Sequence, residues 1–128
     1  MANSAIATRF APQAIGPYSQ GVRADGACLH VSGQLAIDPD TGAITGDDIQ
    51  TQTRQCLTNI KAILDEAGAD MSAVAETTVL LTDIDEFAAM NEVYAEFFRE
   101  PYPARAAFQV VALPKKGAKV EIRAVAYL

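Results

Sequence analysis

The stretch DIQTQTRQCLTNIKAILDEA, residues 48–67, decides the fold class of this chain. Its apolar residues recur at the spacing of an amphipathic helix: Ile49, Cys56, Leu57, Ile60, Ile63 and Leu64. Asp47 or Asp48 can cap the start of such a helix, and Gly68 suits the left-handed residue just past its end. The sequence therefore predicts one long helix near the middle of the chain.

Sequence typical of strands lies on both sides of this helix. The segments that favour strands lie at residues 6–10, 22–24, 28–35, 74–81, 105–111 and 120–127, and residues 74–81 are rich in Val, Thr and Leu. Asp25-Gly26 predicts a hairpin between the second and third of them, and residues 38–42 predict another turn. A second helix is predicted over residues 85–98, with an apolar stripe formed by Phe87, Met90, Tyr94, Phe97 and Phe98. Pro101 and Pro103 prevent its continuation.

This order, β-β-β-α-β-α-β-β, predicts an α+β fold with both helices on one face of a mixed sheet. The 128 residues fit one domain, which we expect to span residues 1–128. The other sheet face would be bare unless another copy of the chain covered it. Half of the residues are hydrophobic, so we expect a homo-oligomer.

Composition limits the possible functions. A net charge of −6, with Lys115-Lys116 as the only basic pair, argues against nucleic-acid binding. No apolar run approaches the ~18 residues of a membrane span, and residues 1–10 lack the pattern of a secretory signal, so we expect a cytoplasmic protein. Cys28 and Cys56 are expected to be buried thiols in a reducing compartment, although a disulfide between them stays open.

Few residues are suited to catalysis. His30 is the only histidine, and it is best interpreted as an ordinary strand residue. The chain has no nucleophile elbow, phosphate-binding loop or dinucleotide-binding motif, and no metal-ligand spacing. What remains is a set of polar residues within apolar segments, namely Ser32, Asn91, Arg105 and Glu121, with Gly33 beside the first of them.

Two interpretations of these residues stay open. In the first, Arg105 and Glu121 form an internal ion pair, while Asn91 and Ser32 bond nearby backbone. In the second, they form a small anion site. The planar fork of Arg105 matches a carboxylate, Glu121 can deprotonate a water, and Ser32 with the Gly33 amide can hold the rest of a substrate.

Four short motifs resemble those of the RidA/YjgF family of imine deaminases. They are Ile15-Gly16-Pro17-Tyr18-Ser19-Gln20-Gly21, Ser32-Gly33-Gln34, Pro103-Ala104-Arg105-Ala106 and Val120-Glu121-Ile122. Asn91-Glu92-Val93-Tyr94 with Phe97-Phe98 also resembles the family's second helix, and the similarity runs from about Ile6 to Tyr127. Each motif is weak alone, but together and in order they are specific.

The resemblance implies a chorismate-mutase-like fold, a homotrimer with sites in the clefts between subunits, and no cofactor or metal. The implied activity is hydrolysis of 2-imino acids, such as 2-iminobutanoate and 2-iminopropanoate, to 2-keto acids and ammonia. By resemblance, Arg105 binds the substrate carboxylate and Glu121 activates the attacking water. The residues that would line the site with them are Tyr18, Ser32, Gly33, Asn91 and Ala107.

Two positions depart from the family pattern. Ala107 stands where relatives often carry a cysteine, which removes a redox-sensitive contact without affecting attack by water. Arg123 stands where close relatives usually carry an acid, on the same strand face as Glu121. If the two are close, a cation there favours the ionised form of Glu121.

The resemblance leaves two other functions open. The chain could hold a keto acid or similar carboxylate without turnover, in which case Arg105 is essential and Glu121 dispensable. It could also be an endoribonuclease or translation inhibitor, a name often attached to the family. The acidic charge and the single histidine argue against that second alternative.

Overall fold

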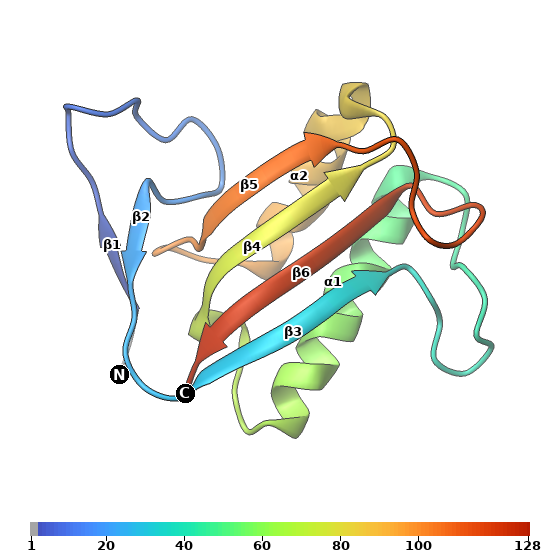
Figure 1. The fold of residues 1–128 in the computed structure, drawn as a ribbon, viewed down its shortest axis with the longest axis horizontal. Helices are drawn as coiled ribbons and strands as arrows, with labels where there is room; N and C mark the ends of the chain where they lie inside the picture. The colour runs from blue at the N-terminus through green and yellow to red at the C-terminus, as the bar shows by residue number, and fades with distance from the viewer. Residues whose placement is uncertain (1–2) are drawn as a thin grey trace.

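Four strands form the main sheet in the order β3–β6–β4–β5, as Figure 1 shows for the computed structural model of residues 3–128. β4 and β5 run parallel, whereas β6 is antiparallel to both β3 and β4. The elements are β1 Ser4–Ile6, β2 Gly21–Arg23, β3 Cys28–Leu35, α1 Ile49–Glu66, β4 Val74–Leu81, α2 Phe87–Phe97, β5 Ala104–Gln109 and β6 Val120–Tyr127, with short 3-10 helices at Met71–Ala73 and Ile84–Glu86. Met1 and Ala2, which belong to the predicted domain and to the N-terminal stretch, lie outside the described residues.

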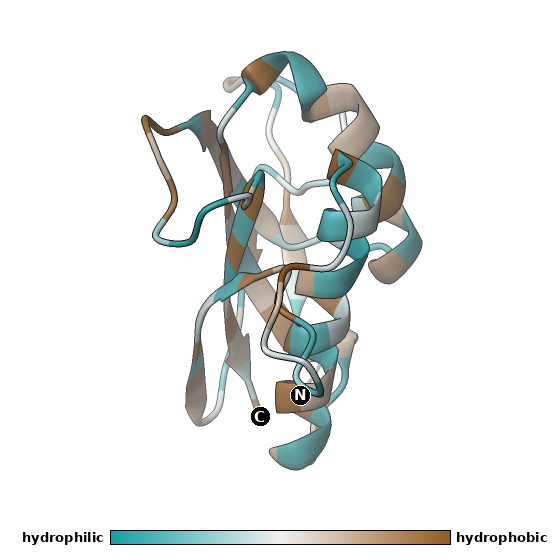
Figure 2. Cartoon of the chain, turned by 90° about the vertical axis from the view of Figure 1, so that its right-hand side faces the viewer, coloured by the Kyte–Doolittle hydropathy of each residue, from teal (hydrophilic) through white to brown (hydrophobic). Residues whose placement is uncertain are grey.

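Both helices pack on the same face of this sheet, as the side view in Figure 2 shows. α1 contacts β3 and β6, and the two helices contact each other. α2 lies in the connection between the parallel strands β4 and β5, where a helix is the usual crossover. The mixed α+β architecture predicted from the sequence is therefore confirmed, although the second helix begins as a 3-10 turn and β5 ends two residues early.

The signals at both ends of α1 explain its length. Asp48 is the N-cap, and its Oδ2 accepts a hydrogen bond of 2.9 Å from the backbone N–H of Thr51. This hydrogen bond lowers the pKa of Asp48. Beyond the last turn, Gly68 has a φ of 79°, which a residue with a side chain rarely adopts.

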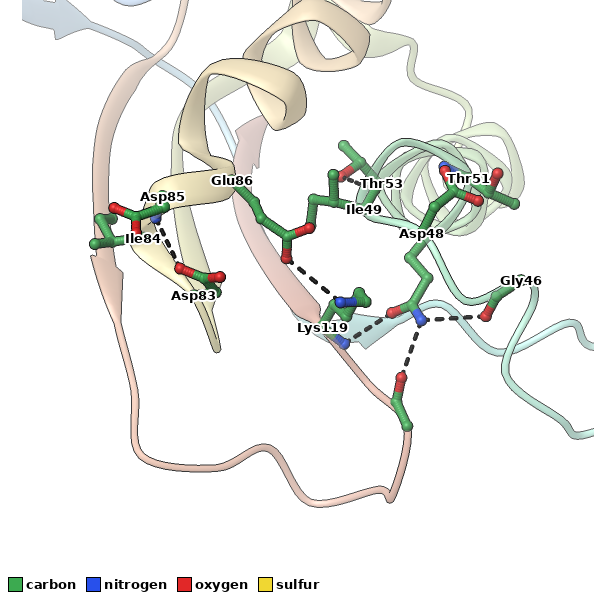
Figure 3. Close-up of polar contacts among 12 residues, drawn as sticks. Gly46, Asp48, Ile49, Thr51, Thr53, Asp83, Ile84, Asp85, Glu86 and Lys119 are labelled. Atoms are coloured by element: carbon green, nitrogen blue, oxygen red, sulfur yellow. Dashed lines mark hydrogen bonds and ion pairs between the residues drawn. The ribbon is translucent and has the colours of Figure 1, made fainter.

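One buried amide attaches α1 to the loop between β5 and β6. Gln52 donates from Nε2 to the carbonyls of Gly46 and Gly117, at 3.2 and 3.0 Å, and its Oε1 accepts from the backbone N–H of Lys119 at 2.8 Å. The side chain of Lys119 also pairs with Glu86, with 3.5 Å between Nζ and Oε1 (Figure 3). The start of β6 is thereby held against α1, through Gln52, and against the 3-10 helix Ile84–Glu86, through Glu86.

The core lies between the sheet and the helices. Alternate strand residues that face the helices are buried, namely Thr77, Val79 and Leu81 of β4 and Val120, Ile122, Ala124 and Ala126 of β6. They pack against the buried stripe of α1, which includes Leu57, Ile60 and Leu64. We call this side of the sheet the inner face.

The opposite side, which we call the outer face, is not covered by a helix within residues 3–128. Glu76, Thr78 and Leu80 of β4 alternate with the buried residues and lie on this face. Phe108, the register partner of Leu80 on β5, is 48% exposed. Coverage of the face by another copy of the chain stays a prediction.

The expectation that both cysteines are buried was wrong for Cys28. Cys56 is buried within α1, but Cys28 begins the edge strand β3 and is exposed. Both thiols are free, so no disulfide joins them.

The strand predicted over residues 6–10 was also misplaced. The strand ends at Ile6, where it pairs with Gly21 of β2. The side-chain amide of Gln20 donates to the carbonyls of Thr8 and Pro12, at 3.0 and 2.8 Å, and its Oε1 accepts from the backbone N–H of Thr8. A side chain thus takes the backbone groups that a longer strand would have paired with another strand.

Asp25-Gly26 does not close the predicted hairpin, because β2 pairs with β1 whereas β3 pairs with β6. Gly26 has a φ of 109°, and a Cβ there would lie 2.1 Å from the carbonyl oxygen of Leu128. The adjacent Ala27 exchanges two backbone hydrogen bonds with Leu128. The glycine therefore directs the chain from the small sheet into the main one.

The turn predicted over residues 38–42 is present, with Gly42 at a φ of 72°.

Within residues 3–128, no helix combines the length and the apolar character needed to cross a membrane.

Candidate functional site

Arg105 extends from β5 on the inner face of the sheet. Its register partner on β4 is Thr77, which is buried beneath α2. The guanidinium donates a hydrogen bond of 2.7 Å from Nη1 to Oδ1 of Asn91 on α2. The structure thus brings together two of the residues that the sequence assigns to the candidate site.

Three aromatic rings surround the same guanidinium. Its Cζ lies 4.7 Å from the ring centroid of Tyr94, 5.2 Å from that of Phe87 and 5.7 Å from that of Tyr18. The electron-rich faces of such rings attract a cation at these distances. Burial lowers the pKa of Arg105, and the nearby Tyr94 and Tyr18 partly oppose this effect. An arginine nevertheless keeps its charge at neutral pH.

Phe87 and Tyr94 were not among the site residues predicted from the sequence, which assigned them only to the apolar stripe of the second helix. The hydroxyl of Tyr94 lies 2.8 Å from Oγ1 of Thr77, and burial raises the pKa of this tyrosine, so its ring is neutral. A usable signal was the spacing of Phe87, Asn91 and Tyr94. Residues four and three apart share one face of a helix, which puts both rings beside the polar residue.

The guanidinium of Arg105 has N–H donors that are available to a ligand. None of the ion pairs found among residues 3–128 includes Arg105. Asn91 takes a single hydrogen bond from the five N–H groups of the fork. A planar cation that is half-buried and held in position, with free donors, is suited to binding a carboxylate through two parallel hydrogen bonds.

Tyr18 is positioned by the turn that precedes β2. Its backbone N–H donates to the carbonyl of Gly16 at 2.8 Å, and the backbone N–H of Ser19 donates to the carbonyl of Pro103 at 3.1 Å. The second bond attaches this turn to the residues just before β5. A Cβ on Gly16 would lie 3.6 Å from the Tyr18 ring and 3.9 Å from Nη2 of Arg105, so this glycine lies at the edge of the guanidinium site.

Glu121 and Gly33 form a second group, on the outer face. Glu121 pairs in register with Leu80 of β4 and Leu35 of β3. Its side chain covers Gly33, because a Cβ added there would lie 2.2 Å from Oε2 and 2.8 Å from Cδ of Glu121. The register of β3 against β6 shifts between Val31 and Gln34, and Ser32 is exposed in this irregular segment. Glycine at position 33 thus leaves the space in which the carboxylate lies.

The two groups lie on opposite faces of one sheet. Arg105 is the register partner of buried Thr77, whereas Glu121 is the partner of Leu80, three residues further along β4. Since successive residues of a strand point to opposite sides, the two side chains point away from each other. The predicted alternative of an internal ion pair between Arg105 and Glu121 is therefore wrong.

The positions that depart from the family pattern divide in the same way. Ala107 is the register partner of Val79, so it lies on the inner face with Arg105. Arg123 is the partner of Thr78 and is exposed on the outer face, the side of Glu121. The ion pairs described for residues 3–128 do not include one between Arg123 and Glu121.

Neither of the grooves nearest these groups contains Arg105. A groove of about 940 Å³ lies between residues 5–20 and Glu100–Tyr102, and Tyr18 contributes to its wall. Another, of about 400 Å³, runs along the end of β3 from Gly33 toward α1. We centre the candidate site on Arg105 because its charge, its partners and its free donors identify a ligand class, which groove volume alone does not. In the part of the chain that the structure describes, no three His, Cys, Asp or Glu side chains gather as metal ligands would.

The sequence and the fold match one family. The model of the endoribonuclease L-PSP family matches residues 8–128. The chain is 55% identical over 94% of its length to the RutC family protein y4sK of Sinorhizobium fredii, and the match also covers 94% of that protein. It is 50% identical to the 2-iminobutanoate/2-iminopropanoate deaminase of Capra hircus, over 94% of this chain and 87% of the relative.

A solved structure of TdcF from E. coli with bound serine has a TM-score of 0.74 and 44% identity, with 98% of both chains covered. Family model, relatives and fold agree over nearly the whole chain. The chain therefore belongs to the endoribonuclease L-PSP family, which is the RidA/YjgF family that its motifs resemble.

Proposed function

We propose that this protein hydrolyses 2-imino acids, such as 2-iminobutanoate and 2-iminopropanoate, to 2-keto acids and ammonia. The observation that carries the proposal is the state of Arg105, a half-buried guanidinium held by Asn91 and three aromatic rings, with no acidic partner among the ion pairs described. Every 2-imino acid carries a carboxylate that fits this fork. The relative from Capra hircus bears the name of this deaminase activity.

The second part of the proposal is that each site is shared by two copies of the chain. One copy supplies Arg105, Asn91, Tyr18 and Ala107. A neighbouring copy supplies Glu121 with Ser32 and Gly33, since one chain holds these groups on opposite faces of its sheet. The exposed outer face gives the second copy a surface to cover, and a homotrimer closes three such sites by rotation.

Within such a site the chemistry needs few groups. Arg105 holds the carboxylate, and Glu121 accepts a proton from a water as its oxygen attacks the C=N carbon. The imine nitrogen takes up a proton, and collapse of the resulting carbinolamine breaks the C–N bond to release ammonia and the 2-keto acid. Imines already hydrolyse in water, so holding imine and water together supplies much of the acceleration. No cofactor or metal enters the proposed reaction.

The test is a competition for free imine. Threonine dehydratase generates 2-iminobutanoate in the presence of semicarbazide, and the semicarbazone is followed by absorbance with and without this protein. We expect the protein to suppress semicarbazone formation, Arg105→Ala to abolish that suppression, and the exposed Arg99→Ala to retain it as the matched control. Full activity of Arg105→Ala would refute the assignment of the site.

The serine bound in the TdcF structure favours one alternative, a module that binds small carboxylates without turnover. Calorimetric titration with 2-ketobutanoate separates the two functions when it is combined with the competition assay. Under the deaminase proposal, Glu121→Gln retains binding but slows hydrolysis. Binding without any suppression of the semicarbazone would favour the module.

The cytoplasmic location expected from the sequence also stays a prediction.

A further inference from the structure

A third groove lies beside the helices, apart from the two grooves described above. It has a volume of about 400 Å³ and lies between α1, the 3-10 helix Met71–Ala73 and the residues that follow α2. None of its lining residues belongs to the main sheet, so a copy that covers the outer face leaves this groove open. The volume is sufficient for a small molecule of the size of an amino acid.

One side chain that lines this groove is buried without using its hydrogen-bond acceptor. Asn3 is only 9% exposed, and its Nδ2 donates to the carbonyls of Ser72 and Ala73, at 3.4 and 3.2 Å. None of the hydrogen bonds described for residues 3–128 uses its Oδ1. Buried polar atoms normally have a partner, so this oxygen is available to an N–H donor of a ligand.

A carboxylate lies close to the same end of the groove. Oδ1 of Asp70 accepts a hydrogen bond of 2.9 Å from the backbone N–H of Ser72 and another from the Ser72 hydroxyl, and Ser72 is also a partner of Asn3. These hydrogen bonds lower the pKa of Asp70, so it is ionised at neutral pH. Asp70 and Oδ1 of Asn3 together suit a positively charged donor such as an ammonium group.

Positive charge reaches the groove from the two helices. Lys61 lies on α1, where it pairs with Asp65 at 3.0 Å, and Arg99 lies two residues after the end of α2. None of the ion pairs described for residues 3–128 includes Arg99, so its planar fork is free to bind a carboxylate. With Glu100, the groove has two positive and two negative side chains, which favours a zwitterion over an ion of either sign.

The rest of the wall is apolar. Phe98 is buried and belongs to the hydrophobic core, and Met71 and Phe97 pack against that core, so this side of the groove is held in place. Pro101 and Pro103 complete it. Such a wall gains from burying an apolar side chain of a ligand.

We propose that this groove binds a free α-amino acid with an apolar side chain. Arg99 binds the carboxylate, Oδ1 of Asn3 accepts a hydrogen bond from the ammonium group beside Asp70, and the side chain packs against the apolar wall. A simple carboxylate would leave Oδ1 of Asn3 without a partner and would be repelled by Asp70. The proposal does not rest on the deaminase function, and either can fail alone.

The experiment is calorimetric titration of the full chain with L-phenylalanine and with L-leucine. We expect saturable binding of both, at about one molecule per chain. 3-Phenylpropionate, which lacks the ammonium group, phenylalaninamide, which lacks the carboxylate, and L-serine, which lacks the apolar side chain, should each bind about tenfold or more weakly.

Two variants assign the contacts. Arg99→Gln should weaken the binding of L-phenylalanine about tenfold but that of phenylalaninamide less than twofold, because only the first ligand has a carboxylate to lose. Arg23→Gln, at an exposed arginine outside the groove, is the matched control and should bind both as the wild type does. Arg105→Ala should also retain binding, which distinguishes this groove from the carboxylate site at Arg105.

Four results would overturn the proposal. The first is no saturation by either amino acid up to about 10 mM. The second is an affinity for L-phenylalanine that Arg99→Gln leaves unchanged. The third is equal binding of 3-phenylpropionate, which would make the groove a general anion site. The fourth is loss of binding in Arg105→Ala, which would place the amino acid at Arg105 instead.

Discussion

Mixing two defective variants should restore part of the lost activity if the site is shared between copies. Arg105→Ala removes the carboxylate-binding residue, and Glu121→Gln removes the proposed base. Each homogeneous oligomer is then defective at every site. In a mixed oligomer, a site regains both residues wherever the copy that supplies Arg105 is the Glu121→Gln variant and its neighbour is the Arg105→Ala variant.

The fraction of activity that should return follows from the positions of Arg105 and Glu121 on opposite faces of one sheet, since each shared site then takes these residues from two copies. In an equal mixture that assembles at random, about half of the copies supply an intact Arg105, and about half of their neighbours supply an intact Glu121. About one quarter of the sites, and hence of the wild-type activity, should return. A site built within a single chain would return none, because no chain of the mixture carries both residues.

The assay is the semicarbazide competition applied to the two variants, denatured together and refolded as an equal mixture. The same variants refolded separately and then combined without exchange form the matched control. Native mass spectrometry shows whether mixed oligomers are present. Mixed oligomers that are no more active than the separate variants would refute the shared site.

Three further perturbations test single contacts. Gly33→Ala places a Cβ 2.2 Å from Oε2 of Glu121, so the carboxylate must move; kcat should fall about tenfold or more while the melting temperature changes little, and an unchanged kcat would separate this carboxylate from the chemistry. Tyr94→Phe keeps the ring against Arg105 but leaves Oγ1 of Thr77 without its partner; denaturant titration should show a loss of about 1 kcal/mol, with KM changed less than twofold, and a tenfold rise in KM would mean that the hydroxyl itself positions the site. Asp48→Ala should lower the melting temperature at neutral pH, while Asp48→Asn, which can still cap, should retain most of it. The pKa of Asp48 is lower in the folded chain than in the unfolded one, so its charge stabilises the fold fully above about pH 4 and loses this effect as the pH falls through the folded pKa. The difference in melting temperature between wild type and Asp48→Ala should therefore shrink in acid. A difference that stays constant with pH would contradict the assignment of Asp48 as a charged cap.

Much of the fold could be predicted because its signals are local. α1 has its cap, its apolar stripe and its terminal glycine within 21 consecutive residues, and neither β4 nor β6 contains a glycine or a proline that would interrupt the strand. The errors came where distant segments decide the pairing. Asp25-Gly26 has the composition of a hairpin turn, yet Gly26 packs against the carbonyl of Leu128, about a hundred positions away in the chain.

The candidate site shows the same division. Sequence alone singled out Arg105 and Asn91, because polar residues in apolar segments need partners, and the structure joins them. It could not exclude an ion pair between Arg105 and Glu121, since the faces of the two side chains depend on the registers of β4 with β5 and β6. The rings of Phe87 and Tyr94 were hidden for a different reason, because an aromatic stripe on a helix also has the appearance of an ordinary core.

The buried amide of Gln52 has a consequence for the order of folding. Its partners at Gly117 and Lys119 lie 65 and 67 positions away in the chain, whereas the cap of α1 is made within three residues. The helix can therefore form early, but the amide finds its partners only once β6 has docked. Gln52→Ala should speed unfolding while leaving the refolding rate almost unchanged, as stopped-flow kinetics would show. Gln52 thus stabilises the folded state without stabilising the transition state for folding.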